Sequence, residues 1–530
     1  MSITNAAQSA VKTVADPNAS YESLKPLWNK SRAVCSGERY VKAYDGVIDP
    51  VSFSNLLIPF SPSMSQAQYN FYKAEAELPG IVSQFAKLLV GGLLRKKPEL
   101  SLPDGIPEEA ANWILNEFGQ DDAPLGSFMD SALWEEMQTS RAWVYVDYPQ
   151  VLNGQDLLQE DFAALKPYPV LWKAEHIINW TVRQGFNGKS QLSRVITREY
   201  IEDFTVNEFH PTFYEVTKVH ELDASGNYQI RIFKRQDPAT DVPVVQGQIV
   251  KQPEKNKAVF YEEEPIQVLV NGAPLKFIPA WPLNGSIEGV EPILSPIIDK
   301  EVALYNKISR RNHLLYGAAT YTPIISSDMS DESFQDIVSA GLGSWIKLDA
   351  GGKADVLRTP TEALQDMDRA IAASIEEMAR LGIRMLSPES DQSGVALQIR
   401  NAAQTAQLGT LNSKVTGTMC QIIAFMLNWR YNLQLKASDI KFSLSADFNP
   451  MPAGADWLRL ATEWYQQGLI PRSVWLAMLK HNDMIAPDYD DEKGREEITE
   501  DQDLLMQKQN EAYAQELAIQ QSLTGEQNGN

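Results

Sequence analysis

Hydrophobic and polar positions divide the chain into a helical first part, a strand-rich middle and a helical second half. Residues 65–97 have apolar positions at helical spacing with a break at Pro79 and Gly80, and residues 127–149 predict a helix that runs into a strand. Over residues 168–285, short runs rich in β-branched and aromatic residues alternate with turn-forming residues, which predicts a β-rich segment. We therefore expect an α+β fold that is mostly helical.

The second half predicts three helices and a small insertion. Apolar positions at helical spacing predict helices over residues 295–317 and 361–381. Between them, residues 318–358 predict a strand in TYTPII, a short helix and a second strand in GSWIKLDA. The longest helix is expected over residues 395–433. The apolar residues of helix 361–381 form one stripe: Leu364, Met367, Ile371, Ile375 and Met378. Those of helix 395–433 recur at steps of three and four, as in a heptad seam: Leu408, Leu411, Val415, Met419, Ile422, Met426, Trp429 and Leu433.

A loop joins the last two of these helices, over residues 382–394. It contains Gly, Pro and Ser, which interrupt helices, and it also carries apolar Met385 and Leu386. After residue 440 the sequence predicts a strand and then a pair of helices that meet near Gly468 and Pro471. The chain ends in an acidic, Gln-rich helical segment.

Composition indicates an ordinary globular protein, with 44% hydrophobic and 22% charged residues. No apolar run approaches the roughly 20 residues that a membrane-spanning helix needs, so we expect no membrane association. The first 20 residues lack a basic head followed by an apolar run, and we expect no secretory signal. The two cysteines, Cys35 and Cys420, predict buried, reduced thiols. A net charge of −22 disfavours tight binding to nucleic acid.

Motifs that could carry chemistry have better structural explanations. GFNGKS at 185–190 lacks the first Gly of a phosphate-binding loop and predicts a β-turn. YEEEP at 261–265 could supply paired carboxylates, but neighbouring residues in a strand point to opposite faces, which favours a strand end. APDYDDEKG at 486–494 lacks the twelfth-position Glu of a calcium loop and predicts a solvated acidic turn.

The histidines and tryptophans likewise predict no reactive centre. No His pairs with another His or a Cys at metal-ligand spacing. Five tryptophans lie mostly within apolar patterns and predict core packing: Trp345, Trp429, Trp457, Trp464 and Trp475. We therefore expect no catalytic residues, no metal and no cofactor, and a protein that is not an enzyme.

The order of elements from residue 291 onward resembles the portal proteins of tailed bacteriophages. A helix entered through Ser295-Pro296 leads into a small α/β insertion, a second helix, the loop GIRMLSPESDQSGVA and a long helix ending FMLNW. The stretches RAVCSGERYVKAY, KLLVGGLLRKKPEL and DFNPMPAGADWLRLATEWYQQGLIPRSVWLAML are also similar to the terminal regions of one portal branch. The order over some 500 residues is more specific than any one stretch.

This resemblance implies a ring of identical subunits, expected to number twelve, at the unique capsid vertex of a virion. It implies a division into regions: wing 1–290, stem helices 291–317 and 359–381, clip 318–358, tunnel loop 382–394, long helix and wing return 395–454, and crown 455–530. The ring would assemble in the host cytoplasm with scaffold and major capsid protein. It would dock the terminase large subunit and later a head–tail adaptor or tail proteins, and conduct double-stranded DNA in packaging and ejection.

The resemblance also implies two functional surfaces. The tunnel loop facing DNA would comprise Arg384, Met385, Leu386, Ser387, Pro388, Glu389, Ser390 and Asp391. The clip docking surface would comprise Asp328, Asp331, Glu332, Trp345, Lys347 and Lys353. Twelve chains at −22 each sum to about −264, so contact with DNA should be weak and non-specific. Arg384 could touch phosphates or pair with a neighbouring Glu.

Two alternatives remain in play. Another virion structural protein, such as an adaptor or tail component, is usually smaller, and the long helix 395–433 argues against it. A carbohydrate-active hydrolase would need two carboxylates facing each other across a cleft, roughly 5–10 Å apart.

Overall fold

The chain forms two compact units, residues 1–448 and 449–530, and each is treated separately below. The structure is a computed structural model. It describes residues 13–44, 56–149, 165–184, 188, 190–205, 208–236, 260–319, 322–326, 330, 353–357, 362–380, 394–445, 455–481, 484–485, 489–491, 493–495 and 498–499.

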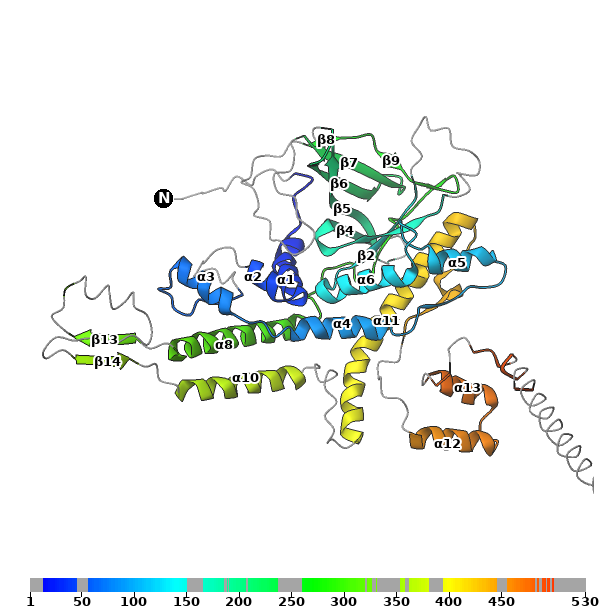
Figure 1. The fold of residues 1–530 in the computed structure, drawn as a ribbon. Helices are drawn as coiled ribbons and strands as arrows, with labels where there is room; N and C mark the ends of the chain where they lie inside the picture. Colours follow the sequence, from blue (N-terminus) through cyan, green and yellow to red (C-terminus); the bar gives the residue numbers. More distant parts are fainter. Residues whose placement is uncertain are drawn as a thin grey trace, which may run out of the picture. The chain divides into compact units, whose positions relative to one another are not determined.

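Among the described residues, six helices build the N-terminal part of the first unit (Figure 1). Local sequence sets their starts: the Asn18 side chain accepts the Tyr21 N–H at 2.7 Å, and Ser65 with Gln68 forms a capping box. The break predicted within 65–97 is confirmed, because a helix begins directly after Gly80, whose φ is +71°. The helices are α1 (Ala19–Ser36), α2 (Glu38–Tyr44), α3 (Gln66–Glu75), α4 (Ile81–Leu93), α5 (Glu108–Asn116) and α6 (Leu125–Thr139).

The predicted β-rich segment is confirmed as antiparallel sheets. The main sheet is a meander of β4 (Ile177–Gln184), β5 (Ser190–Asp203), β6 (Thr212–Leu222), β7 (Tyr228–Arg235) and β8 (Phe260–Glu262), with β9 (Ile266–Gln267) also paired to β7. A second sheet has the order β12 (Ala280–Pro282), β2 (Trp143–Asp147), β3 (Tyr168–Trp172). Two short pairs join β10 (Leu269–Val270) to β11 (Ala273–Pro274) and β1 (Glu99–Ser101) to β15 (Lys441–Ser443).

The helices predicted for the second half are present in the expected order. They are α8 (Ser295–Ala319), α10 (Glu362–Arg380) and α11 (Gly394–Tyr431). Between α8 and α10, β13 (Thr322–Ser326) pairs antiparallel with β14 (Lys353–Leu357). The first predicted strand of the insertion is therefore confirmed. Its partner β14 follows Gly351 and Gly352, whereas the strand predicted in GSWIKLDA lies outside the described residues.

Two hydrophobic clusters form the core of the first unit. One gathers apolar side chains of α1, α4, α6, α8 and α11, and the other lies between the main sheet, β2, β3 and α1. The seam predicted for α11 is buried from Leu411 to Trp429, and the buried surface also includes Cys420, Ile423 and Leu427. Leu433 lies beyond the end of the helix and is half-buried. Helix α11 therefore passes through a globular core rather than presenting a narrow coiled-coil seam.

The second unit contains the predicted helix pair, α12 (Ala455–Gln466) and α13 (Arg472–His481). Gly468 has φ +73° and lies just past the end of α12, where a left-handed residue terminates a helix. Tyr465 and Trp475 stack across the pair with ring centroids 4.8 Å apart. The acidic segment predicted at the C-terminal end lies mainly outside the described residues. No helix in the described part of the chain has the length and apolarity to cross a membrane.

Candidate functional site

The helix pair α8 and α10 is the candidate functional element of the first unit. The two helices run antiparallel and are linked at their outer ends to the β13–β14 ribbon (Figure 1). Leu304 and Tyr305 of α8 are fully buried, and Met378 of α10 is 1% exposed. The stripe predicted for α10 is confirmed for Met378 and for the half-buried Leu364, Met367 and Ile371, whereas Ile375 is 45% exposed.

Polar contacts repeat along the seam between α8 and α10. Lys300 pairs with Glu377, Lys307 Nζ donates to Ser374 Oγ at 2.6 Å, and Arg311 Nε donates to Asp368 at 2.8 Å. In each contact the cation is on α8 and the acceptor on α10. Such partly exposed pairs contribute little to stability, but their spacing fixes how the two helices are aligned.

The first half of α8 is anchored to the N-terminal helices by a buried carboxylate. Glu301 is 0% exposed, and its two oxygens accept the backbone N–H groups of Ile81 and Val82, each at 2.8 Å. These N–H groups begin α4 and have no partner within that helix, so the carboxylate satisfies them and complements the helix dipole. Burial raises the pKa of Glu301 above its usual range, although the backbone N–H groups oppose the shift.

Asn306 makes the second buried anchor one turn further along. Its side chain accepts the Ile58 N–H at 2.8 Å and donates to the carbonyl oxygens of Leu56 and Val302, at 2.7 and 2.8 Å. The outer part of α8 meets α3 through aromatic contacts instead. His313 lies 5.2 Å from the ring of Tyr72 between centroids.

The residues predicted to face DNA and docking partners are mostly outside the described part. This holds for the whole predicted tunnel-loop set, Arg384 to Asp391, and for five of the six predicted clip residues. Lys353 is described: it is exposed at the start of β14, opposite Ser326. The roles assigned to these residues stay predictions.

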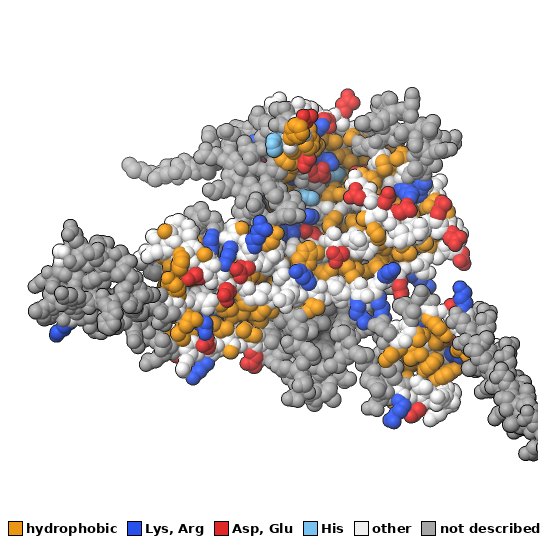
Figure 2. All heavy atoms as spheres, viewed as in Figure 1, with side chains coloured by type: hydrophobic (Ala, Val, Ile, Leu, Met, Phe, Trp, Pro, Cys, Tyr) orange, Lys and Arg blue, Asp and Glu red, His pale blue; other side chains and the backbone are white. Residues whose placement is uncertain are grey.

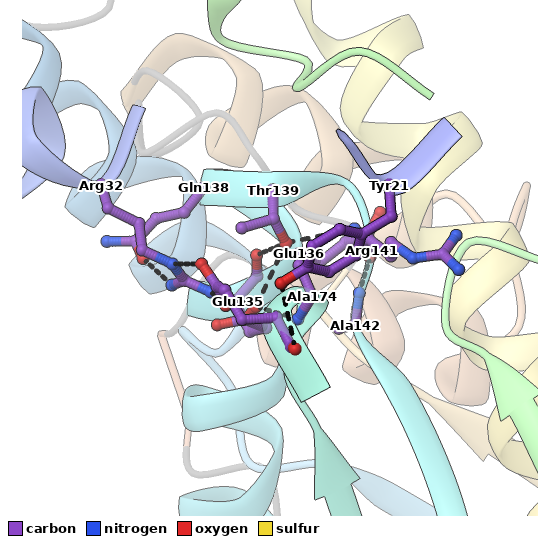
Figure 3. Close-up of polar contacts among 10 residues, drawn as sticks. Tyr21, Arg32, Glu135, Glu136, Gln138, Thr139, Arg141, Ala142 and Ala174 are labelled. Atoms are coloured by element: carbon purple, nitrogen blue, oxygen red, sulfur yellow. Dashed lines mark hydrogen bonds and ion pairs between the residues drawn. The ribbon is translucent and has the colours of Figure 1, made fainter. Parts of the chain in front are cut away.

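A partly buried ionic network joins α1, α6 and the segment before β4 (Figure 3). Arg32 donates from Nε and Nη2 to the two oxygens of Glu175, at 2.6 and 2.7 Å, and from Nη2 to Glu135 at 2.6 Å. It also donates to Gln138 at 2.8 Å. Burial alone would lower the pKa of Arg32, but the two carboxylates outweigh burial and raise it. The network therefore holds three segments distant in sequence in one arrangement.

Next to this network lies a second buried carboxylate. Glu136 is 3% exposed and accepts the Ala142 N–H at 3.0 Å and the Asn284 amide at 2.9 Å. Burial raises the pKa of Glu136 to about 7, against the effect of these two donors. Its neighbour Arg141 is 2% exposed and stacks on the Trp180 ring at 3.8 Å from the centroid. Glu135 and Glu136 both have partners within the fold, so the geometry explains them as structural groups.

An aromatic cluster surrounds His220 under the main sheet. His220 Nδ1 and the Tyr228 hydroxyl are 2.7 Å apart, and Tyr228 donates to the Tyr145 hydroxyl at 3.2 Å. Tyr145 in turn stacks on Trp172 with centroids 4.6 Å apart. Burial lowers the pKa of His220 to about 3, so this imidazole is neutral at ordinary pH.

Two of the motifs weighed from the sequence lie at strand ends of the main sheet. Residues 185–190 join the antiparallel strands β4 and β5, with φ +74° at Gly188, which fits the predicted turn. Glu262 of the YEEEP run ends β8 and pairs with Arg231, and Glu263 pairs with Lys234.

The remaining sequence predictions concern the acidic turn near residue 490, the cysteines and the tryptophans. Asp491 is bound by Arg472 and Arg495 at 2.8 and 3.0 Å. Within the described residues no group of three His, Cys, Asp or Glu is arranged to hold a metal ion. Both cysteines are buried, as predicted. Core packing is confirmed for Trp429, while Trp464 and Trp475 are half-buried; Trp345 and the Trp457 side chain lie outside what is described.

Comparison with known proteins identifies one matching family model and a distant structural likeness. Residues 294–430, which include α8, the ribbon, α10 and nearly all of α11, match the family described as "Domain of unknown function (DUF4055)". No curated protein matches the chain. A chain from a solved structure titled "Virion of native gene transfer agent (GTA) particle" is similar at 10% identity, over 73% of this chain and 85% of that chain, with a TM-score of 0.33. That score is too low to support an argument about fold or function.

Proposed function

We propose that this chain is the subunit of a portal ring at the capsid vertex of a tailed phage or related particle. One observation carries the proposal: two antiparallel helices, α8 and α10, end in a β-ribbon at one end and are followed by the long helix α11. This is the order of stem, clip, stem and wing helix that the sequence resemblance implies. The matched family region begins and ends with the same elements.

In this proposal the buried anchors give the stem its direction. Glu301 and Asn306 fix the first half of α8 to the N-terminal helices. The pairs between α8 and α10 then align the second stem helix. The ribbon would serve as the clip, to which a packaging motor and later a tail component dock. The loop over residues 382–394 would face the DNA in the channel.

The charge of the chain fits conduction better than capture. Affinity for duplex DNA comes mainly from cations that neutralise phosphates. A chain of net charge −22 provides a surface that repels a polyanion on average. A ring of such subunits would let DNA slide past with weak, non-specific contacts.

The decisive experiment measures mass and symmetry of the purified full chain. Native mass spectrometry should find a closed assembly near twelve times 59.3 kDa, and negative-stain class averages should show rotational symmetry and a central hole. A chain that stays monomeric, also when it is co-expressed with a scaffold protein and a major capsid protein, overturns the proposal. Closed assemblies without an axial hole favour the alternative, another structural component of the particle.

A further inference from the structure

The connector between β12 and α8, residues 283–294, is held near both ends by the turn that follows α6. Asn284 Nδ2 donates to the Ser140 carbonyl at 2.8 Å, and the Ile293 N–H donates to the Ser140 hydroxyl at 2.9 Å. Ser140 has φ +51°, a left-handed conformation that is uncommon outside glycine and costs free energy. One strained residue therefore fastens the connector that leads into α8.

The middle of the connector lies against a buried arginine, Arg141. Its Nη1 atom donates to the Ile287 carbonyl at 3.3 Å. A Cβ atom on Gly289 would lie 3.5 Å from the same Nη1 and 2.3 Å from the Leu24 side chain of α1, so a larger residue would have to push Leu24 aside. The residues on both sides of Glu288 therefore lie close to the guanidinium group.

Arg141 lacks the partner that a buried cation needs. Charged side chains lie on the surface of the protein in Figure 2, where water solvates them, whereas Arg141 is 2% exposed. Its Nε and Nη2 atoms are covered, and among the described residues neither has a hydrogen-bond partner. Figure 3 shows the side chain pointing away from Arg32 and its carboxylates. Burial lowers the pKa of Arg141 to about 10, and Glu288 is first among the charges that oppose the shift. A position in which the two covered atoms gain a carboxylate would relieve this cost.

The carboxylate of Glu288 lies at the edge of the ring on which Arg141 is stacked. The guanidinium carbon is 3.8 Å from the centroid of the Trp180 ring, and Trp180 Nε1 donates to Glu288 Oε2 at 3.1 Å. One ring therefore carries the cation on its face and the anion at its edge. The Nε and Nη2 atoms of an arginine can bind a carboxylate through two parallel hydrogen bonds. In Arg141 these are the two atoms without a partner among the described residues.

We infer that Glu288 has two alternative partners, Trp180 Nε1 and the Nε–Nη2 edge of Arg141, and that the connector is a two-position strap at the base of α8. The structure shows the first position. In the second, the connector shifts so that the carboxylate reaches the covered edge and leaves the indole. The gain of a bidentate ion pair is set against the loss of the indole bond and the disturbed contacts of Ser140. Because the connector leads directly into α8, the shift would move the start of the helix that the proposed function assigns to the stem.

Hydrogen–deuterium exchange of the full chain, on peptides covering residues 283–294, tests the second partner. Trp180→Phe removes the indole N–H and retains an aromatic ring under Arg141, so only the second partner is left for Glu288. In this background Glu288→Gln should accelerate exchange of the connector about tenfold, the effect of one charge-assisted hydrogen bond. The matched control is Glu291→Gln, which removes an exposed carboxylate of the same connector and should change exchange less than about twofold.

Adding Arg141→Met to Trp180→Phe should abolish the effect of Glu288→Gln, because the second partner is then gone. Arg141→Lys replaces it where the methionine variant does not fold, since lysine keeps the charge and lacks the two-atom edge. A silent Glu288→Gln in the Trp180→Phe background overturns the inference, because a carboxylate with a single partner has none left to lose there. An effect that persists without the guanidinium edge overturns it as well. Every contact in the test lies within one chain, so its failure leaves the proposed ring standing, and the absence of rings leaves the strap standing.

Discussion

Replacing Glu301 by Gln should loosen the start of α4 without disturbing the exposed surface. The carboxylate accepts two backbone N–H groups, from Ile81 and Val82, at 2.8 Å each. A glutamine keeps one acceptor oxygen and points an amide N–H₂ at the other donor. A hydrogen bond to a charged group contributes about 1.5–3 kcal/mol, and an unsatisfied buried donor costs about 1–3 kcal/mol. The same change removes a buried charge, which offsets part of the loss.

We therefore expect the Glu301→Gln variant to lose about 2 kcal/mol of local stability at the α8–α4 junction. A factor of ten in the local opening equilibrium corresponds to about 1.4 kcal/mol. Amide exchange in the first turns of α4 should therefore become roughly 30-fold faster. Hydrogen–deuterium exchange with mass spectrometry on peptides covering residues 80–93 measures this directly.

Glu291→Gln is the matched control, because Glu291 is exposed just before α8 and the change should stay within about 0.5 kcal/mol. An exchange rate in residues 80–93 that stays within twofold of the unmodified protein would refute the reasoning. It would mean that Glu301 does not hold α4 in solution.

Three further variants test the ionisable side chains Glu136, His220 and Arg32, and thermal or denaturant unfolding measures their effect on stability. Burial raises the pKa of Glu136 to about 7, so the folded chain keeps a proton that the unfolded chain releases above about pH 4.5. Compared with the Glu136→Gln variant, the native protein should therefore lose about 3 kcal/mol of its free energy of unfolding as pH rises from about 4.5 to 7. Burial lowers the pKa of His220 to about 3, so below about pH 6.5 the unfolded chain binds a proton that the folded chain does not. The free energy of unfolding should therefore fall by about 1.4 kcal/mol per pH unit below about 6.5, and the His220→Gln variant should lack this slope. Arg32→Met leaves the buried carboxylate of Glu135 and the partly exposed one of Glu175 without their cation and should cost about 1.5–3 kcal/mol at pH 7, whereas an unchanged midpoint would contradict a structural role.

Periodicity predicted the element types well because most helices bury one regular face. The heptad-like spacing of α11 identified its length and its buried positions from Leu411 to Trp429. It did not predict that Cys420 and Ile423 are also buried, since packing of several elements around one helix is decided by the tertiary fold. The strand β14 was missed because a run of five residues, KADVL, carries little pattern of its own until it pairs with β13.

The buried polar anchors were missed for a different reason. Arg32 reaches Glu135 and Glu175 across 103 and 143 residues of sequence, and no local pattern connects them. Glu301 did leave a trace in the sequence. It occupies a position of the apolar stripe of α8, between Ile298 and Leu304, where a carboxylate must either be exposed or find buried donors. Such an interruption in a regular stripe is the pattern that could have identified it.

The contacts of α8 divide this helix into two mechanically different halves. Its first half is bound by buried groups, Glu301 and Asn306, whose partners would be left unsatisfied if the helix moved. Its outer half meets α3 through half-exposed rings such as Tyr316 and meets α10 through exposed pairs such as Arg311 with Asp368, which cost little to break. In the proposed ring, a subunit would hold a fixed place while its ribbon end accepts different partners in turn, and both would depend on this combination. Firm attachment of α8 at its base and weak lateral contacts toward β13 and β14 would provide it.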